Sequence, residues 1–184
     1  TSAVQRLYVR ERVGSRKRDN AAFCDHLAAL PLMHQPGTRW EYSRATDVLG
    51  RIVEVIDGRP LGESLAARIL RPLAMHDTGF SVPADRHPRL AGAFARDPDT
   101  GGNVTLDDVS APPLFESGGG GMASTVSDYL RFAQMLLAGG TLDGVRLLGR
   151  KTVEWMTSDH LGGMAADSPL LPPGYGFGLG FAVR

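Results

Sequence analysis

Apolar residues recur at helical spacing in the stretch from residue 39 to residue 58. One side of a helical wheel drawn through it is lined by five apolar residues, Val48, Leu49, Ile52, Val53 and Ile56. Such a stripe predicts a helix with this face in the core. Ser43 is placed to cap the first turn, and Gly58 is the residue type that most easily closes a helix in the left-handed conformation.

The same spacing predicts four more helices, over residues 20–30, 61–70, 126–137 and 150–157. Thr125 and Asp128 stand at the spacing of a capping box at the start of the third of these. We expect the inward face of that helix to consist of Tyr129, Leu130, Phe132, Ala133, Leu136 and Leu137.

Other segments favour extended structure. Glycine alternates with larger residues from residue 174 to residue 181, which predicts a strand whose glycine face lies close to another part of the chain. Between residues 75 and 108 the pattern loosens, and residues 78–82 and 90–95 are expected to form short strands or covering loops. The chain is therefore predicted to be one α+β domain in which helices dominate.

Composition narrows the classes of partner. The 20 basic residues balance the 20 acidic ones, so no net field attracts nucleic acid or an anionic membrane. No stretch approaches the roughly 20 apolar residues of a membrane span. Cys24 is the only cysteine. An intrachain disulfide and a cysteine-rich metal site are thereby excluded, and the cytoplasm is slightly favoured over the periplasm.

Tyr42 is the first candidate for chemistry. It is predicted to lie at or just before a helix N-terminus, where unpaired N–H groups and the positive end of the helix dipole favour a phenolate. A tyrosine so placed can work as a base.

Four consecutive glycines, Gly118 to Gly121, form the second candidate. No convincing strand precedes them and no acidic residue follows at the spacing that a ribose needs, which argues against a dinucleotide fingerprint. A backbone without side chains can approach a ligand closely. This leaves two alternatives, the wall of a substrate cleft or a plain flexible connection.

Two common nucleophile motifs are absent from these 184 residues. Neither Lys17 nor Lys151 has a serine three residues before it, and there is no Gly-x-Ser-x-Gly elbow. The consecutive residues Ser158, Asp159 and His160 project in different directions and cannot form a relay among themselves.

Four sequence blocks nevertheless support a resemblance when they are taken in their order along the chain. They are Pro36-Gly37, the run Trp40-Glu41-Tyr42-Ser43 with Asp47, residues 71–80, and residues 117–125. Together they are similar to the middle of the serine β-lactamase and penicillin-binding-protein-like hydrolases. The chain resembles most the carboxylesterase branch related to class C β-lactamases.

The resemblance implies a Ser–Lys–Tyr hydrolase that cleaves a small ester or amide through an acyl-enzyme, without a cofactor. Tyr42 matches the tyrosine that transfers protons together with the lysine. Asp47 is implied to orient the site, the alternative being an ordinary first-turn acid stabilised by the helix dipole. Gly119, Gly120 and Gly121 match the block that lines the cleft.

The departures from the family pattern are also informative. Arg44 stands where β-lactamases and peptidases often have asparagine, which favours an esterase. The family's Ser-x-x-Lys motif belongs before Thr1 and its third motif after Arg184. We therefore expect residues 1–184 to be a single domain that is incomplete at both ends and inactive alone. Its expected partner is the missing part of the same protein or a second copy. A non-catalytic remnant or binding module of the same fold is the alternative.

Overall fold

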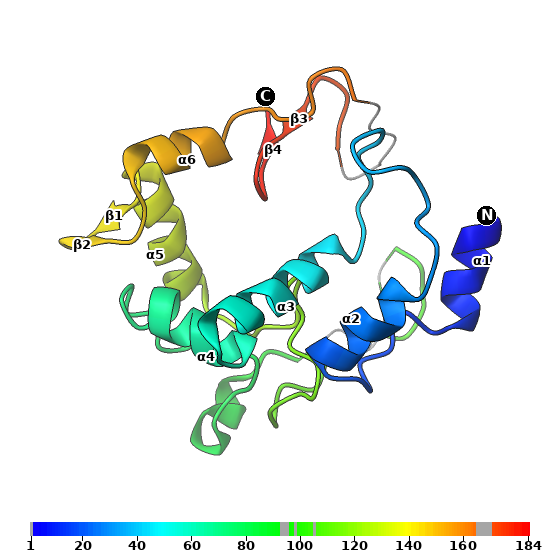
Figure 1. The fold of residues 1–184 in the computed structure, drawn as a ribbon. Coiled ribbons are helices and arrows are strands. Elements are labelled where there is room, and N and C mark those ends of the chain that lie inside the picture. Colours follow the sequence, from blue (N-terminus) through cyan, green and yellow to red (C-terminus); the bar gives the residue numbers. More distant parts are fainter. Residues whose placement is uncertain (1, 93–95, 98, 105, 165–170) are drawn as a thin grey trace.

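The computed structural model describes residues 2–92, 96–97, 99–104, 106–164 and 171–184. Helices dominate, and the only regular sheets in these ranges are two small antiparallel hairpins, so the predicted α+β class is confirmed (Figure 1). The elements in chain order are α1 (Ala3–Arg10), α2 (Asn20–Ala28), α3 (Ala45–Asp57), α4 (Leu61–Leu65), the π-helix η1 (Ala66–Leu70), the 3₁₀-helix η2 (Ala84–Arg89), α5 (Val126–Leu137), β1 (Thr141–Leu142), β2 (Val145–Arg146), α6 (Arg150–Met156), β3 (Gly176–Phe177) and β4 (Ala182–Val183).

The predicted helices are confirmed to within a few residues at their ends. The segment predicted over residues 61–70 begins as α4 and widens into η1, where the N–H of Arg71 reaches back five residues to the carbonyl of Ala66. Gly58 closes α3 in the left-handed conformation with φ at 69°. The Thr125 hydroxyl accepts a hydrogen bond from the Asp128 N–H, as the capping pattern predicts.

The strand predicted over residues 174–181 is confirmed only for β3, because residues 178–181 form the turn that leads to β4. Gly176 of β3 pairs with Val183 of β4, and Phe177 pairs with Ala182. The close approach of the glycines is confirmed. A Cβ on Gly176 would lie 2.2 Å from the Asp159 carboxyl carbon, and one on Gly178 would lie 2.2 Å from the Met156 carbonyl oxygen.

The described residues between 75 and 108 form turns and loops more than strands. In residues 78–82 a single β-bridge joins Gly79 to Ala123, and η2 follows. The second proposed strand, over residues 90–95, lies partly outside the described residues. Loops are thus the correct choice of the two alternatives for residues 78–82.

Two apolar clusters form the core. One joins η1 and the following turn to α5 through Leu70, Leu73, Met75 and Met135. The other joins α2 to the segment before the glycine run through Val13, Phe23 and Phe115, with the Phe23 and Phe115 rings 5.0 Å apart. The helix α3 lies between α2 and α4 and contacts both (Figure 1).

The predicted core face of α3 is largely wrong. Leu49, Ile52 and Ile56 are 57%, 46% and 79% exposed, whereas Asp47 and Gly50 on another face are buried. Periodicity tells which face of a helix is apolar but not which segment covers it.

The prediction for α5 is wrong in the same way for Tyr129, Leu130, Ala133 and Leu137, which are exposed. Phe132 and Leu136 pack against the first cluster as predicted. In the part of the chain that the structure describes, no helix is both long and apolar enough to cross a bilayer.

Candidate active site

Tyr42 lies in an extended segment just before α3, and its neighbours are held in place. The ring of Trp40 packs on that of Phe177 with centroids 4.9 Å apart, and His34 Nε2 lies 2.9 Å from a carboxylate oxygen of Glu41. Tyr42 itself is 67% exposed. Its phenol is therefore accessible to a substrate, and its role as a base stays a prediction.

Ser43 caps the first turn of α3 as predicted, because its hydroxyl accepts a hydrogen bond from the N–H of Ala45, the first helical residue, at 3.2 Å. The N-cap position itself falls on Arg44, whose side chain makes no capping bond. The positive end of the α3 dipole thus lies two or three residues from Tyr42.

Asp47 points into the protein from this turn and is 3% exposed. Its Oδ1 accepts hydrogen bonds from the Ser117 hydroxyl and, at 3.3 Å, from the Gly119 N–H. Its Oδ2 lies 3.3 Å from an Arg44 guanidinium nitrogen. Asp47 therefore does more than stabilise the helix dipole, because it joins α3 to residues 117–121, which we call the glycine loop.

The glycine loop crosses the first turns of α3 at backbone distance. A Cβ on Gly118 would lie 2.1 Å from the Thr46 carbonyl oxygen, which leaves room for glycine alone. Gly119 faces the Thr46 hydroxyl, whereas nothing lies within 4 Å of a Cβ on Gly120. Gly121 has φ at 85°, a conformation that favours glycine. These contacts argue against a plain flexible connection, and that the loop lines a substrate cleft stays a prediction.

Asn20 holds the chain just before the glycine loop. Its side-chain amide donates to the Glu116 carbonyl and to the Glu54 carboxylate, both at 2.9 Å, and its oxygen accepts the Glu116 N–H at 3.1 Å. Sequence analysis did not identify Asn20, because its partner lies 96 residues away and no local motif announces the pair.

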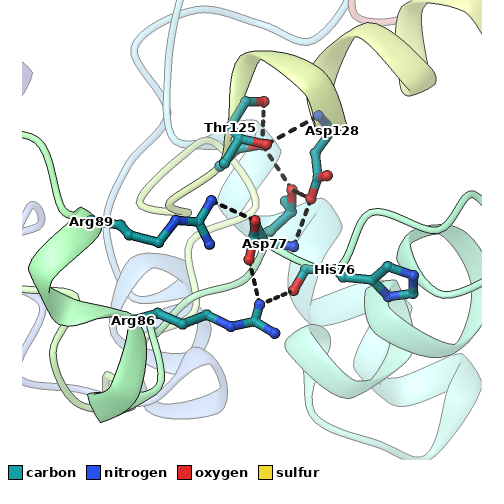
Figure 2. Close-up of polar contacts among 8 residues, drawn as sticks. His76, Asp77, Arg86, Arg89, Thr125 and Asp128 are labelled. Carbon is teal, nitrogen blue, oxygen red and sulfur yellow. Dashed lines mark hydrogen bonds and ion pairs between the residues drawn. The ribbon is translucent and has the colours of Figure 1, made fainter.

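Asp128 holds the chain just after the glycine loop (Figure 2). Its carboxylate accepts the Asp77 N–H and the Thr78 hydroxyl, both at 2.8 Å, and Thr78 Oγ1 lies 2.8 Å from Ser124 Oγ. The capping pattern predicted only the contact with Thr125. Two buried carboxylates thus hold this region, Asp47 within the glycine loop and Asp128 just after it.

Figure 2 also shows Asp77 between two guanidinium groups. Arg89 donates to one carboxylate oxygen at 2.8 Å, and Arg86 bonds the other and the carbonyl of His76. Arg89, followed by Arg86, holds the pKa of Asp77 below its ordinary value. A cavity of about 100 Å³ lies beside this cluster. Because both arginines are already bound to Asp77, we assign the cluster to holding η2 in place.

The described residues contain no group of three or more His, Cys, Asp or Glu side chains that could hold a metal ion.

Comparison with known proteins gives consistent matches. The family described as Beta-lactamase matches residues 1–184. Protein Rv1367c of Mycobacterium tuberculosis is 44% identical over 163 residues, which cover 86% of this chain and 40% of that protein. Esterase EstB of Burkholderia gladioli is 31% identical over 74% of this chain and 39% of its own length. Lovastatin esterase of Penicillium rubens is 30% identical over 86% of this chain.

Solved structures agree in fold. EstCE1, described as a hydrolase with promiscuous acyltransferase activity, superposes with a TM-score of 0.65 at 25% identity, over 93% of this chain and 49% of that one. A penicillin-binding-protein homologue of Caulobacter crescentus gives a TM-score of 0.68 at 24% identity, over 89% and 47% of the two chains. The chain thus spans about 40% of the length of the curated relatives it matches.

Proposed function

The chain belongs to the β-lactamase family, and on that premise we propose that it forms the middle of a serine hydrolase that cleaves ester or amide bonds through an acyl-enzyme. One structural observation supports this proposal most. An exposed tyrosine, Tyr42, directly precedes a helix whose first turn is joined by Asp47 to a fixed glycine loop.

In the proposed mechanism a serine hydroxyl attacks the carbonyl carbon of the substrate. The proton of that hydroxyl passes to a base formed by Tyr42 and a lysine, and the leaving group takes up a proton as it departs. Water then releases the acid from the acylated serine. The start of α3, with its unpaired N–H groups, lies close to Tyr42 in the sequence and favours the negative charge that this role places on the phenol oxygen.

Ester substrates are favoured over β-lactams and peptides. Two relatives with at least 30% identity are named as esterases. Arg44 also replaces the asparagine that many β-lactamases and peptidases have at this position. We propose an esterase on these two grounds.

The nucleophile is proposed to lie outside residues 1–184, because neither lysine of this chain belongs to a Ser-x-x-Lys motif. The chain alone is then inactive, and its partner is the rest of the same protein. A non-catalytic remnant or binding module is the second candidate, supported by that same missing motif.

The experiment starts from the coding sequence that flanks these residues. A Ser-x-x-Lys motif upstream supports the hydrolase, whereas its absence from the whole gene supports the remnant. The protein encoded by the whole gene is then assayed with p-nitrophenyl butyrate. Loss of a proton-transfer group lowers kcat by roughly 10²- to 10⁴-fold, which is the expected result for Tyr42→Phe.

Tyr129→Phe is the matched control, because Tyr129 is 66% exposed and lies on α5, outside the proposed site. This variant is expected to keep full activity. Equal activity of the Tyr42→Phe variant and the unchanged protein would refute the role of Tyr42. Hydrolysis by purified residues 1–184 alone that disappears in Tyr42→Phe would refute an external nucleophile.

A further inference from the structure

An open groove of about 480 Å³ lies between the end of α1 and the start of α3. Its floor is apolar and consists of Tyr8, Val9 and Val13, while its polar lining includes Arg12, Ser15 and Arg44. An apolar floor beside two guanidinium groups fits a molecule that has a short hydrocarbon chain and a negative charge.

Arg12 places an unpaired positive charge in this groove. Its backbone is fixed, since its N–H donates to the Val9 carbonyl at 3.1 Å and its carbonyl accepts from Arg18 at 3.3 Å. Its side chain is exposed, and its guanidinium has no ion-pair or hydrogen-bond partner among the residues that the structure describes. All five of its N–H donors are therefore open to a ligand.

Arg44 supplies the second charge. Arg44 lines the groove, one of its nitrogens lies 3.3 Å from Asp47, and its side chain is 46% exposed, so further N–H donors remain for a ligand. The lining contains no acidic residue, and the charged residues next to it in the sequence are paired: Arg16 lies 2.7 Å from Asp107, and Glu11 lies 3.0 Å from Arg10. The groove thus has an excess of positive charge.

The groove is also close to the proposed catalytic tyrosine. Arg44 is two residues from Tyr42, which limits the distance between their Cα atoms to about 7 Å. The groove and Tyr42 therefore share the segment that leads into α3.

We propose that this groove selects substrates that carry a carboxylate, which binds Arg12 and Arg44 while the adjoining chain lies on the apolar floor. Guanidinium groups suit this task because their N–H donors match the two oxygens of a carboxylate. That the bound molecule is a substrate rests on the proposed function, but its binding can be measured without any reaction.

The test titrates the 184-residue chain with sodium hexanoate and follows backbone and arginine Nε–H signals by NMR. We expect saturable shifts at Gly14, Ser15 and Arg44. Hexanol, which has the same chain length without the charge, is expected to bind about tenfold more weakly, as a charge-assisted hydrogen bond contributes roughly 1.5 kcal/mol.

Arg12→Gln and Arg44→Gln are each expected to weaken hexanoate binding about tenfold. Arg12→Gln is the safer variant, because the Arg12 guanidinium supports no other described residue. Arg150→Gln removes the same charge from the exposed start of α6 and is expected to bind as the unchanged chain does.

Equal binding of hexanol and hexanoate would overturn the proposal, as would unchanged binding in both arginine variants or equal weakening in Arg150→Gln. The outcome is separable from that of the esterase assay. Hexanoate binding without hydrolysis by the whole protein refutes only the proposed function, and hydrolysis without hexanoate binding refutes only the selectivity of the groove.

Discussion

The Asp47 carboxylate accepts a hydrogen bond from the Ser117 hydroxyl, across 70 residues of sequence. Both side chains are buried, and the Gly119 N–H lies within hydrogen-bond distance of each. Because Asp47 sits one turn after Tyr42, the contact fixes the glycine loop relative to the start of α3. The geometry of the candidate site thus depends on a polar contact between two distant segments.

Asp47→Asn tests this contact. The aspartate carboxylate accepts three hydrogen bonds, from Ser117, Gly119 and Arg44. Asparagine keeps one acceptor oxygen, but it loses the negative charge and turns an NH₂ group toward a donor. We expect the free energy of unfolding to fall by about 2 kcal/mol and the Gly119 amide to exchange its hydrogen faster. Urea denaturation and hydrogen exchange measure the two effects.

Glu63→Gln separates the buried contact from the helix dipole. Glu63 is an exposed acid in the first turn of α4, so its loss removes a dipole interaction alone. The expected cost is about 0.5 kcal/mol. A similar small cost for Asp47→Asn, with unchanged exchange at Gly119, would mean that Asp47 is only a first-turn acid.

Gly118→Ala and Gly120→Ala are a matched pair within the glycine loop. The new methyl group collides with the Thr46 carbonyl oxygen at residue 118 and meets nothing within 4 Å at residue 120. We expect Gly118→Ala to destabilise the chain by about 3 kcal/mol and Gly120→Ala to change stability by less than about 1 kcal/mol. Thermal unfolding followed by circular dichroism gives both values, and equal values would show that the loop is flexible.

Local patterns in the sequence predicted the helices well. Helix boundaries depend on residues within about four positions of them. Thr125 marks the start of α5, Gly58 marks the end of α3, and proline and glycine breaks mark other ends. The hairpin of β1 and β2 had an equally local signal that sequence analysis missed, the pair Asp143-Gly144, whose φ angles of 48° and 80° are those of a tight hairpin turn.

Long-range features were not predictable in the same way. Nothing near Asn20 or Asp128 in the sequence indicates partners 96 and 51 residues away. Tyr42 and Asp47 were predicted at the start of α3 from helix position and family resemblance, and the structure has them there, while their roles stay predictions. The contact that joins Asp47 to the glycine loop depends on how the chain closes on itself and emerged only from the structure.

Asp57 gives a prediction on pH dependence. Arg68, followed by Ser64 and Arg59, holds the pKa of Asp57 far below its ordinary value. A carboxylate with a depressed folded pKa stabilises the fold above its unfolded pKa of about 4, and this contribution is lost as the pH falls through the folded pKa. We expect Asp57→Asn to lower stability at pH 7.

The stability gap between the unchanged chain and Asp57→Asn is expected to stay constant above about pH 5 and to shrink as the pH is lowered from about 4 to 2. Urea denaturation at several pH values measures it. Asp25→Asn, at an exposed position on α2, is the control and should cost little at any pH. A gap for Asp57→Asn that is independent of pH would contradict the depressed pKa.

The exposed apolar face of α3 leads to the last prediction. Leu49, Ile52 and Ile56 lie on one side of the helix and are mostly exposed, and such a stripe favours association with another apolar surface. We propose that residues 1–184 alone self-associate through it, and we expect dimers or larger species in light scattering.

Lysine at both Ile52 and Ile56 should yield monomers with nearly unchanged stability, because little packing is lost. Lysine at exposed Val9, on α1, should leave association unchanged. A monodisperse monomer of the unchanged chain would contradict this role for the α3 face.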